Sequence, residues 1–550
     1  MHQKITSGIV ARPIGEAFDW LTTPGFWPRV SPVSLAIEAE DPWRPLRVGD
    51  RFRERAHVAL WRGHFDWVVD AVERPHRCVL TAVTGGDTVL SKLTGHIPAR
   101  LEITLESDGD STRITRAASH PALAEVVGFG HAFDHACDVT MQTIVATLNN
   151  PLLFGPRPDS TAESLLHEAD PLADDAAAAL ISAAGDCSAL ESLVASLDRG
   201  DPPDADVPEA VRRFLDATEQ RPAWACESRL VAASEIFLEW GVLSVAAHIC
   251  ASLPETYQLP PTAKLLDLTR QLDADPHHVD RRLWFTVRMC FDVLTEHGLD
   301  ANGRGRLALQ RLRLLHAMVR LFVQRRLETP HRLSQLATRG LWDSDAGQPI
   351  SQLELLHTLL TFSHGVVRSF AIFGVELTPY QRESYIHIWN VAGALLGIRP
   401  ELLPRDADDA ARIFEGIKQR FGGATDAAPR LGRGLVEFWT GLFPEMIRKE
   451  ASELMQFVIS MLLTPETAHI NGFDDLPSFS PKSANALRHF LAGVDRIGSH
   501  LFSDVPPVQQ AAALFVSLLM RKASEAYEDK SGIFDIPEKL YSRWCGVVAT

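Results

Sequence analysis

The hydrophobic pattern changes its period part-way along the chain, and this change limits the folds that the sequence can adopt. Over about the first 150 residues, apolar and polar side chains alternate, which is typical of strands half-buried in a sheet. From about Ser228 onward, apolar side chains recur at helical spacing and no strand-like alternation is left. We therefore expect a multidomain protein with a strand-rich beginning and a helical remainder.

Length and composition exclude several classes of protein. The 550 residues exceed one ordinary core, so about two or three domains are expected. Hydrophobic residues make up 46% and the net charge is −16, which indicates a globular protein and argues against nucleic-acid binding. The seven cysteines include no CxxC pair, which argues against a thiolate zinc site and favours a reducing, cytoplasmic location. The apolar stretches are too short for a transmembrane helix.

The N-terminal part alternates in seven segments that we predict to be strands: 4–10, 34–38, 51–59, 63–72, 78–83, 101–106 and 111–117. A proline opens a short predicted helix at 13–22, and a long helix is predicted at 122–148. This order of elements predicts an α+β fold in which an antiparallel sheet wraps the last helix.

A short motif adds a resemblance. The segment PIGEAFDWLTTPGFWPRVSP (13–32) and the order of elements make residues 1–150 similar to the START-like helix-grip superfamily, which includes polyketide cyclases. The resemblance implies a hydrophobic cavity under the long helix but no single activity, because the superfamily contains both enzymes and lipid carriers. Phe26 and Trp27 can equally be ordinary core or loop aromatics. The predicted domains are a helix-grip domain (1–150), an acidic linker with a helical segment (151–225) and a large all-α domain (226–550).

One predicted helix carries the residues most suited to chemistry. The segment 306–322 is rich in leucine and lacks glycine and proline. Arg313, His316 and Arg320 are spaced three and four residues apart, so they lie on one face of the helix. An imidazole can ligate haem iron, and guanidinium groups can pair with propionates. The alternative is a surface stripe of charge, or a core histidine bound to a backbone carbonyl.

Several blocks around this helix resemble one family, the latex clearing protein and MpaB-type oxygenases. They occur in order over about residues 230–475: LPETYQLPPTAKLLDLTRQL (253–272), DRRLWFT (280–286), RLRLLHAMVR (311–320), GQPISQLELLHTLLTFS (347–363) and YQRESYIHIWNVAGALLGIRPELLP (380–404). The resemblance implies an all-helical fold, a b-type haem and O₂-dependent attack on hydrophobic substrates.

On this resemblance, His316 corresponds to the proximal haem ligand, and Arg313 and Arg320 to the arginines that flank it. Arg282 and Thr286 correspond to an arginine and a threonine on the distal side, and they lie one helical turn apart. For Arg282 the alternative is an ion pair at the start of a helix.

The sequence departs from the rubber-cleaving members at one position. Phe285 stands where those members have a lysine that can close the distal iron site. A phenylalanine cannot coordinate iron, so the distal site is expected to be open or water-ligated, and rubber as the substrate is in doubt. Two further histidines, His357 and His364, share a helix face and could line the pocket or simply pack.

We therefore expect a haem b-dependent oxygenase that uses O₂ on a hydrophobic small molecule or on an isoprenoid- or polyketide-like substrate. His316 would be the axial ligand, with Arg282 and Thr286 in the distal pocket. The alternative is a lipid- or polyketide-binding protein, or a cyclase, that uses the N-terminal cavity and has a non-catalytic helical domain.

Overall fold

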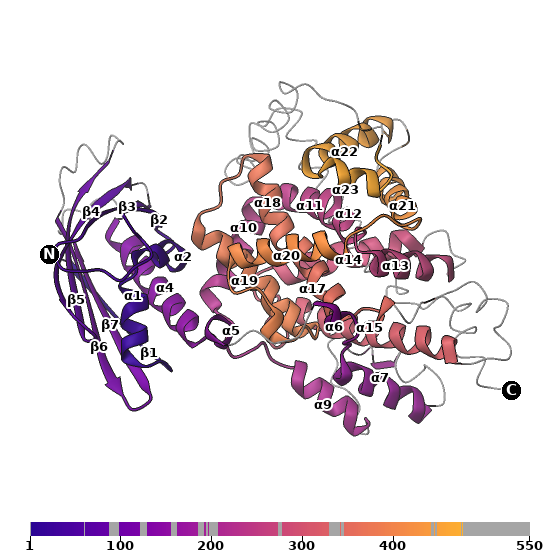
Figure 1. Ribbon diagram of the computed structural model, residues 1–550, viewed down its shortest axis with the longest axis horizontal. Coiled ribbons are helices and arrows are strands. Elements are labelled where there is room, and N and C mark those ends of the chain that lie inside the picture. The colour runs from indigo at the N-terminus through magenta and orange to yellow at the C-terminus, as the bar shows by residue number, and fades with distance from the viewer. Residues whose placement is uncertain are drawn as a thin grey trace. The chain divides into compact units, whose positions relative to one another are not determined.

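The structure is a computed structural model (Figure 1). It describes residues 2–59, 61–86, 98–120, 129–155, 162–184, 192–193, 196, 207–272, 278–328, 342, 346–441, 445, 448–474 and 476. The chain forms two compact units. The first, called the sheet unit below, comprises Met1–Gly155, Ala223–Ala233 and Leu377–His387. The second, called the helical unit, comprises Pro156–Pro222, Ser234–Glu376 and Ile388–Thr550.

Seven antiparallel strands form one sheet, drawn in indigo and purple in Figure 1. They are β1 (His2–Val10), β2 (Ser34–Glu38), β3 (Arg51–Val58), β4 (Trp61–Glu73), β5 (Arg77–Gly85), β6 (Pro98–Asp108) and β7 (Ser111–His120). Their order across the sheet is β1-β7-β6-β5-β4-β3-β2. Burial alternates strictly along β3, where Phe52, Ala56 and Val58 face inward, so the alternation that predicted the strands also fixes which face is buried.

The fold class predicted for the N-terminal part, an α+β helix-grip domain, is wrong. The residues form a curled antiparallel half-barrel of seven strands, and a helical domain follows it, as predicted. The sequence contains a local signal for each strand, the alternation of its side chains, but none for the arrangement of the strands in the sheet. It depends on the pairing of β1 with β7, and on register shifts between Ser34 and Ala36 and between Val69 and Ala71. Such shifts bend and twist a sheet, and alternation within one strand does not report them.

Short helices and one long helix complete the N-terminal part. They are α1 (Ile14–Leu21), η1 (Pro24–Phe26), α2 (Trp27–Val30), α4 (Phe129–Asn149) and α5 (Pro151–Phe154). Helix α4 packs against β1, where Lys4 forms an ion pair with Asp138 at 2.7 Å. Residues 122–128 of the predicted long helix lie outside the described residues. Trp27 is buried in the core, and Phe26 stacks on Trp20 with ring centroids 5.0 Å apart.

From Ala162 onward, the secondary structure of the described residues is helical. Its elements are α6 (Ala162–Leu166), α7 (Pro171–Ala184), α9 (Glu209–Thr218), α10 (Glu227–Glu239), α11 (Gly241–Ala247), the π-helix η3 (His248–Ser252), α12 (Leu253–Thr256), α13 (Pro260–Leu272), α14 (His278–Leu294), α15 (Arg304–Glu328), α17 (Gln352–Phe362), α18 (His364–Phe373), α19 (Pro379–Leu395), η5 (Pro400–Leu402), α20 (Ala407–Phe421), α21 (Ala428–Gly441), α22 (Arg448–Leu462) and α23 (Pro465–Ile470). No single helix within the described ranges is long and apolar enough to cross a membrane; the bent pair Glu227–Glu239 and Leu243–Thr256 meets the criteria only together.

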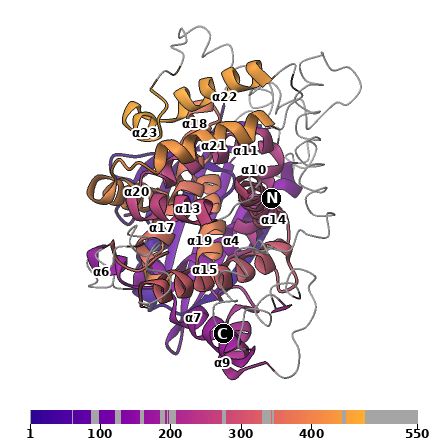
Figure 2. The same cartoon turned by 90° about the vertical axis from the view of Figure 1, so that its right-hand side faces the viewer.

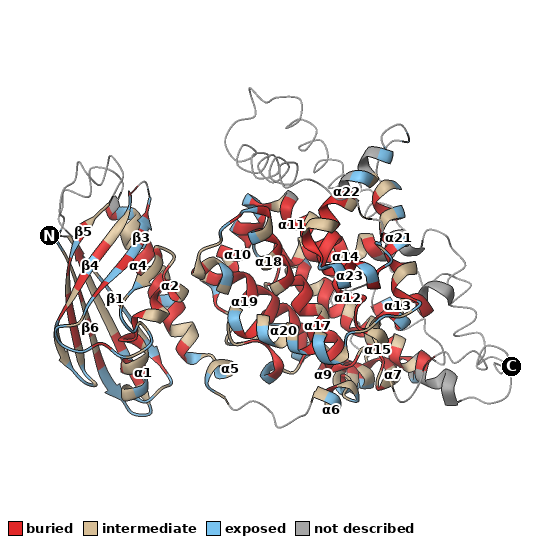
Figure 3. Cartoon of the chain, turned by 45° about the horizontal axis from the view of Figure 1, so that its top comes forward, coloured by how far each residue is buried: buried red, intermediate tan, exposed pale blue. Residues whose placement is uncertain are grey.

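The centre of the helical unit is α17. Every one of its residues except Thr358 is buried, and Figure 3 shows it in red almost throughout. A capping box starts this helix: the Ser351 side chain accepts from the Glu354 N–H, and the Glu354 carboxylate accepts from the Ser351 N–H. Helices α7 and α15 pack side by side, as the two perpendicular views agree (Figures 1 and 2). This pair positions the residues predicted to carry chemistry.

Candidate functional site

Helix α15 brings Arg313, His316 and Arg320 together, as their spacing predicted. Arg313 and Arg320 are buried, with 8% and 1% of their surface exposed. The predicted alternative of a surface stripe of charge therefore does not hold for these two side chains. Because buried guanidinium groups must be paired to be tolerated, their partners decide what the stripe can do.

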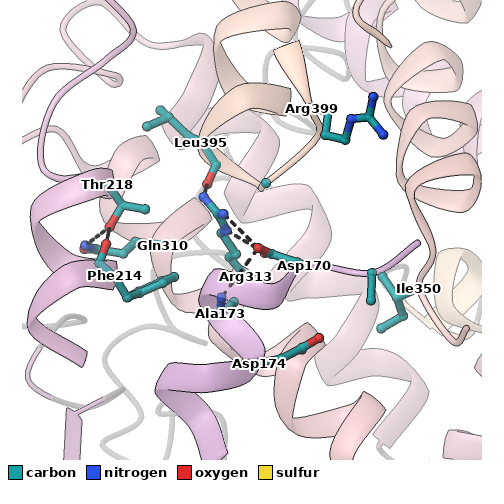
Figure 4. Close-up of polar contacts among 12 residues, drawn as sticks. Asp170, Ala173, Asp174, Phe214, Thr218, Gln310, Arg313, Ile350, Leu395 and Arg399 are labelled. Carbon is teal, nitrogen blue, oxygen red and sulfur yellow. Dashed lines mark hydrogen bonds and ion pairs between the residues drawn. The ribbon is translucent and has the colours of Figure 1, made fainter. Parts of the chain in front are cut away.

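Arg313 is paired with the start of α7. Its Nε donates to Asp170 Oδ2 at 2.6 Å and its Nη2 donates to Asp170 Oδ1 at 2.9 Å, and Nη1 donates to the Leu395 carbonyl at 3.2 Å (Figure 4). The Asp170 carboxylate also accepts from the Ala173 N–H at 3.5 Å, in the first turn of α7. One carboxylate thus caps a helix and binds an arginine with two parallel hydrogen bonds.

Arg320 is paired one turn further along α7. Its Nε donates to Asp174 Oδ1 at 2.7 Å, its Nη2 lies 2.7 Å from the same oxygen, and its Nη1 donates to the Ile350 carbonyl at 3.3 Å. Burial raises the pKa of the Asp174 carboxyl, and the charge of Arg320 opposes that rise. The two arginines that flank His316 therefore both fasten α15 to α7.

A glycine allows the chain to pass close to the Arg313–Asp170 pair. Gly397 has a φ of +90°, and a Cβ atom there would lie 2.4 Å from Asp170 Oδ2 and 2.6 Å from Arg313 Nε. Gln352 holds the same segment, since its Nε2 donates to the Gly397 carbonyl at 3.0 Å. Only glycine fits at this position, because both the conformation and the space exclude a side chain.

His316 lies between the two paired arginines and has no such partner. Its Nδ1 atom is buried without a hydrogen bond, while part of the residue's surface stays accessible. Burial, together with the charge of Arg320, lowers the pKa of the His316 imidazole to about 3. The ring is therefore neutral at physiological pH and keeps a lone pair free for a ligand. The predicted alternative of a hydrogen bond from Nδ1 to a backbone carbonyl is not observed.

The predicted distal residues lie on α14, which packs against α15. The side chain of Arg282 lies outside the described residues, and Thr286 is half-buried. Phe285 contacts α15 directly: the Arg311 guanidinium lies 4.5 Å from the centroid of its ring. An arginine over an aromatic ring is a favourable contact, so the residue that replaces the family's lysine helps to join the two helices.

The other two predicted histidines surround a phenylalanine. The His357 ring stacks on Phe414 with centroids 5.6 Å apart, and the His364 ring lies 5.5 Å from it. Burial lowers the pKa of each imidazole to about 4, helped by Lys418 at His357 and by Arg368 at His364. His357 Nδ1, like His316 Nδ1, is buried without a hydrogen bond, but the rings of His357 and His364 pack on Phe414. Within the described part of the chain, no group of three or more His, Cys, Asp or Glu side chains could hold a metal ion.

The sequence reasoning missed Asp170 and Asp174, which determine how the arginines are used. Both lie in the acidic stretch that composition had marked as linker-like. A signal was present there: an aspartate followed by a proline is a typical start of a helix, with the aspartate at the cap and the proline in the first turn. What no local signal carried was that this helix start would lie beside α15.

Comparisons with known proteins agree with the sequence resemblance. Residues 270–495 match a family model described as "ER-bound oxygenase mpaB/B'/Rubber oxygenase, catalytic domain". "Rubber oxygenase" from Streptomyces sp. (strain K30) is 25% identical over 248 residues, which are 44% of this chain and 56% of that protein. A solved structure, "Structure of Latex Clearing Protein LCP in the closed state", matches with a TM-score of 0.52 at 20% identity, over 68% of this chain and 93% of that chain.

The predicted resemblance to latex clearing protein and MpaB-type oxygenases is thus confirmed. The chain spans little more than half the length of the rubber oxygenase that it matches. At 20% identity, the likeness to the solved structure demonstrates a shared fold and assigns no residue a role.

Proposed function

We propose that the helical unit is a haem b-dependent oxygenase domain whose axial iron ligand is His316. One observation carries the proposal: a neutral imidazole, with its Nδ1 buried and without a hydrogen bond, lies in the middle of a helix that two arginine–aspartate pairs hold in place. An unsatisfied buried nitrogen costs stability. The presence of such a nitrogen at His316 is explained if the imidazole binds a ligand that the chain itself does not supply.

The residues fit haem on the histidine side. A haem iron needs one protein nitrogen, since the porphyrin supplies the in-plane ligands, and the lowered pKa of His316 keeps its imidazole deprotonated and able to ligate. Bound haem would supply redox-active iron that binds O₂. The matched family of oxygenases supports this cofactor for residues 270–495.

Arg313 and Arg320 have a different part in this proposal. Both guanidinium groups are already bound by Asp170 and Asp174, so pairing with haem propionates requires those carboxylates to be exchanged. The predicted cofactor-binding role stays a prediction, and the role that the contacts support is positioning. Two ion pairs fix the rotation of α15 about its axis and so fix the direction in which His316 points.

Phe285 limits which protein ligands the iron could have on the distal side. A phenylalanine offers iron no lone pair, and its ring is held by Arg311 at 4.5 Å. We propose that the distal site is open or water-ligated, with Arg282 and Thr286 as its polar residues. The ferric protein should then have the absorption spectrum of high-spin haem. A low-spin spectrum from a second strong protein ligand would contradict this part of the proposal.

The substrate we propose is a hydrophobic small molecule, or an isoprenoid- or polyketide-like chain, with O₂ as co-substrate. The family supports the apolar class, and the missing lysine at position 285 argues against rubber itself. The cytoplasmic location suggested by the cysteines is part of the same proposal. A second candidate, a binding protein, is favoured by the cavity in the sheet unit described below.

The test is the optical spectrum of the full chain, purified from cells supplied with a haem precursor. We expect a Soret band in the wild type and in His364→Ala, which removes a buried histidine of the same unit. We expect no band in His316→Ala. In His316→Gly, added imidazole should restore the band, because a free imidazole can take the vacated position.

Two outcomes would overturn the proposal. One is a wild-type protein that is colourless and does not take up added haemin. The other is a His316→Ala protein that keeps both the Soret band and its line shape. The rescue by imidazole separates ligation from folding, because a misfolded variant would not regain haem on addition of a small molecule.

A further inference from the structure

The sheet unit contains a cavity of about 90 Å³ that has no part in the proposed oxygenase site. It lies over the inner face of the sheet, and aromatic rings supply much of its wall: Trp20, Trp27, Phe65, Trp67 and Phe133. Phe65 and Trp67 stack with centroids 5.6 Å apart, and Trp27 meets Trp67 edge-on at 6.4 Å. Such a wall suits a flat apolar molecule.

Two charged residues interrupt this apolar wall. Glu54 lies on the inward face of β3, between Phe52 and Ala56. Arg116 lies on β7, between Ile114 and Ala118, and both it and Glu54 line the cavity. Strands β3 and β7 are separated by three other strands in the sheet, so the curl of the half-barrel gives both residues access to the same cavity.

Glu54 does not neutralise Arg116. The two side chains form no ion pair, although the charge of each contributes to the pKa of the other. Burial raises the pKa of the Glu54 carboxyl, and the carboxyl accepts a hydrogen bond from Trp67 Nε1 at 2.9 Å. Burial thus favours the uncharged form of Glu54, which makes the carboxyl a weak counter-ion for Arg116.

The other acidic groups nearby are also not available as counter-ions. Burial raises the pKa of the Cys137 thiol to about 11, so this lining residue is uncharged at physiological pH. On the same helix, Asp134 binds His2 at 3.0 Å and Asp138 binds Lys4 at 2.7 Å. Arg116 is therefore a cation in an aromatic cavity, and no side chain among the described residues forms a hydrogen bond or ion pair with it.

We propose that this cavity is a binding site for a small aromatic carboxylic acid, whose carboxylate pairs with Arg116 and whose ring lies against the tryptophan wall. Glu54 acts as the second polar contact, and in its protonated form it donates a hydrogen bond to an oxygen of the ligand. The guanidinium fork matches a carboxylate with two parallel hydrogen bonds. An unpaired buried charge destabilises the unbound protein, and such a cost is typical of a functional site.

The size of the cavity sets the size of the ligand. A volume of about 90 Å³ is suited to a molecule with one aromatic ring and favours it over an extended lipid chain. Benzoate is therefore the probe, benzyl alcohol is its uncharged analogue, and dodecanoate is a carboxylate with a long chain. We expect the affinity to fall in the order benzoate, benzyl alcohol, dodecanoate.

The experiment measures the dissociation constants of these three probes for the full chain by ligand-observed NMR. The variant is Arg116→Gln, and the matched control is Arg113→Gln on the same strand, where Arg113 is exposed and pairs with Asp108 at 3.5 Å. We expect Arg116→Gln to raise the Kd of benzoate at least tenfold and to leave that of benzyl alcohol unchanged. Arg113→Gln should leave both unchanged.

A second measurement separates binding from structure. If Arg116 serves a ligand, removing its uncompensated charge should raise the melting temperature of the unbound protein, whereas a structural arginine would give a lower melting temperature. The proposal fails if benzoate does not bind the wild type, if Arg116→Gln binds it equally well, or if Arg116→Gln melts at a lower temperature. The Soret band, measured on the same samples, reports on His316 alone, so neither hypothesis depends on the other.

Discussion

Two arginines, the buried Arg313 in the helical unit and the half-buried Arg116 in the sheet unit, have opposite surroundings. Arg313 has a carboxylate within 3 Å on two of its nitrogens. Arg116 lines a cavity and forms no ion pair with Glu54, whose pKa burial raises, while Asp134 and Asp138 are bound to His2 and Lys4. The same side chain therefore has two uses. Where the chain supplies the counter-ion, arginine joins helices; where it does not, arginine is free to bind a ligand.

The comparison extends to the uncharged polar atoms. In the helical unit the flanking arginines are paired and the imidazole between them is not. In the sheet unit, Arg116 forms no hydrogen bond or ion pair with another side chain among the described residues. In each unit we assign a ligand to one group that lacks such a partner: haem iron for His316 and a carboxylate for Arg116.

The largest effect is expected when Arg313 loses its counter-ion and so comes to resemble Arg116. Asp170→Asn removes the counter-ion of Arg313 and should lower the free energy of unfolding by about 3–5 kcal/mol, because it leaves a buried charge without compensation. Urea denaturation of the variant measures this loss. The double variant Asp170→Leu/Arg313→Met should recover most of it. A loss below about 1 kcal/mol would mean that the pair is not a structural one.

A smaller effect is expected from crowding the same pair. Gly397→Ala forces a Cβ atom to within 2.4 Å of Asp170 Oδ2 at a φ of +90°, and should destabilise the protein by about 2–3 kcal/mol. Gly416→Ala is the control, since nothing lies within 4 Å of a Cβ atom at that helical position. It should stabilise the protein by up to about 1 kcal/mol. Equal melting temperatures for the two variants would contradict the crowding.

The third prediction concerns pH and has opposite signs in the two units. Burial lowers the pKa of His357 to about 4 in the folded protein, whereas an unfolded histidine titrates near pH ~6.5. The unfolded chain alone therefore takes up a proton between these values. Relative to His357→Gln, the wild type should lose about 2 kcal/mol of stability as the pH falls from 7.5 to 5.

The sheet unit supplies the opposite case. Burial raises the pKa of Glu54, so its contribution to stability is complete below the unfolded pKa near ~4.5 and is lost as the pH rises through the folded value. Relative to Glu54→Gln, the wild type should therefore lose stability as the pH rises from about 4.5 to about 7.5. Chemical denaturation at several pH values tests both slopes, and two slopes of the same sign would contradict the comparison.

The smallest effect is expected at an arginine that is paired but exposed. Arg53 donates to Asp66 at 2.6 Å on the outer face of the sheet, one residue before Glu54. Both side chains are more than 40% exposed, so solvent screens the pair. Arg53→Ala should change the free energy of unfolding by less than about 1 kcal/mol. A loss as large as that of Asp170→Asn would show that burial is not what separates the two cases.

The elements of the fold were largely predictable, and their arrangement was not. All seven strands were predicted from alternation; the one at 34–38 has the observed bounds, and the one at 51–59 ends one residue later than β3. The strand order, in which β1 pairs with β7, was out of reach because pairing joins residues more than 100 positions apart, such as Val10 and Thr112. Residues 477–550 of the predicted all-α domain lie outside the described residues.

The candidate site divides in the same way. Helical spacing was enough to predict that Arg313, His316 and Arg320 share one face, because that geometry is local. The counter-ions of the two arginines were not predictable, because Asp170 and Asp174 approach only when α7 packs on α15. A charged residue on the inward face of an alternating strand, as at Glu54, was a signal available in the sequence. Such a residue indicates a cavity only once the strand order is known.

The Arg313–Asp170 pair also has a consequence for the order in which the chain folds. The ribosome makes Asp170 before it makes Arg313, 143 residues later. During that interval, the nascent α7 can pack on α9, but its acidic first turn lacks the arginine that pairs with Asp170. Closure of a contact this distant in sequence is slow. Helix α7 therefore completes its folding only after α15 has emerged, and chains cut short before residue 313 should be readily digested at α7 by proteases.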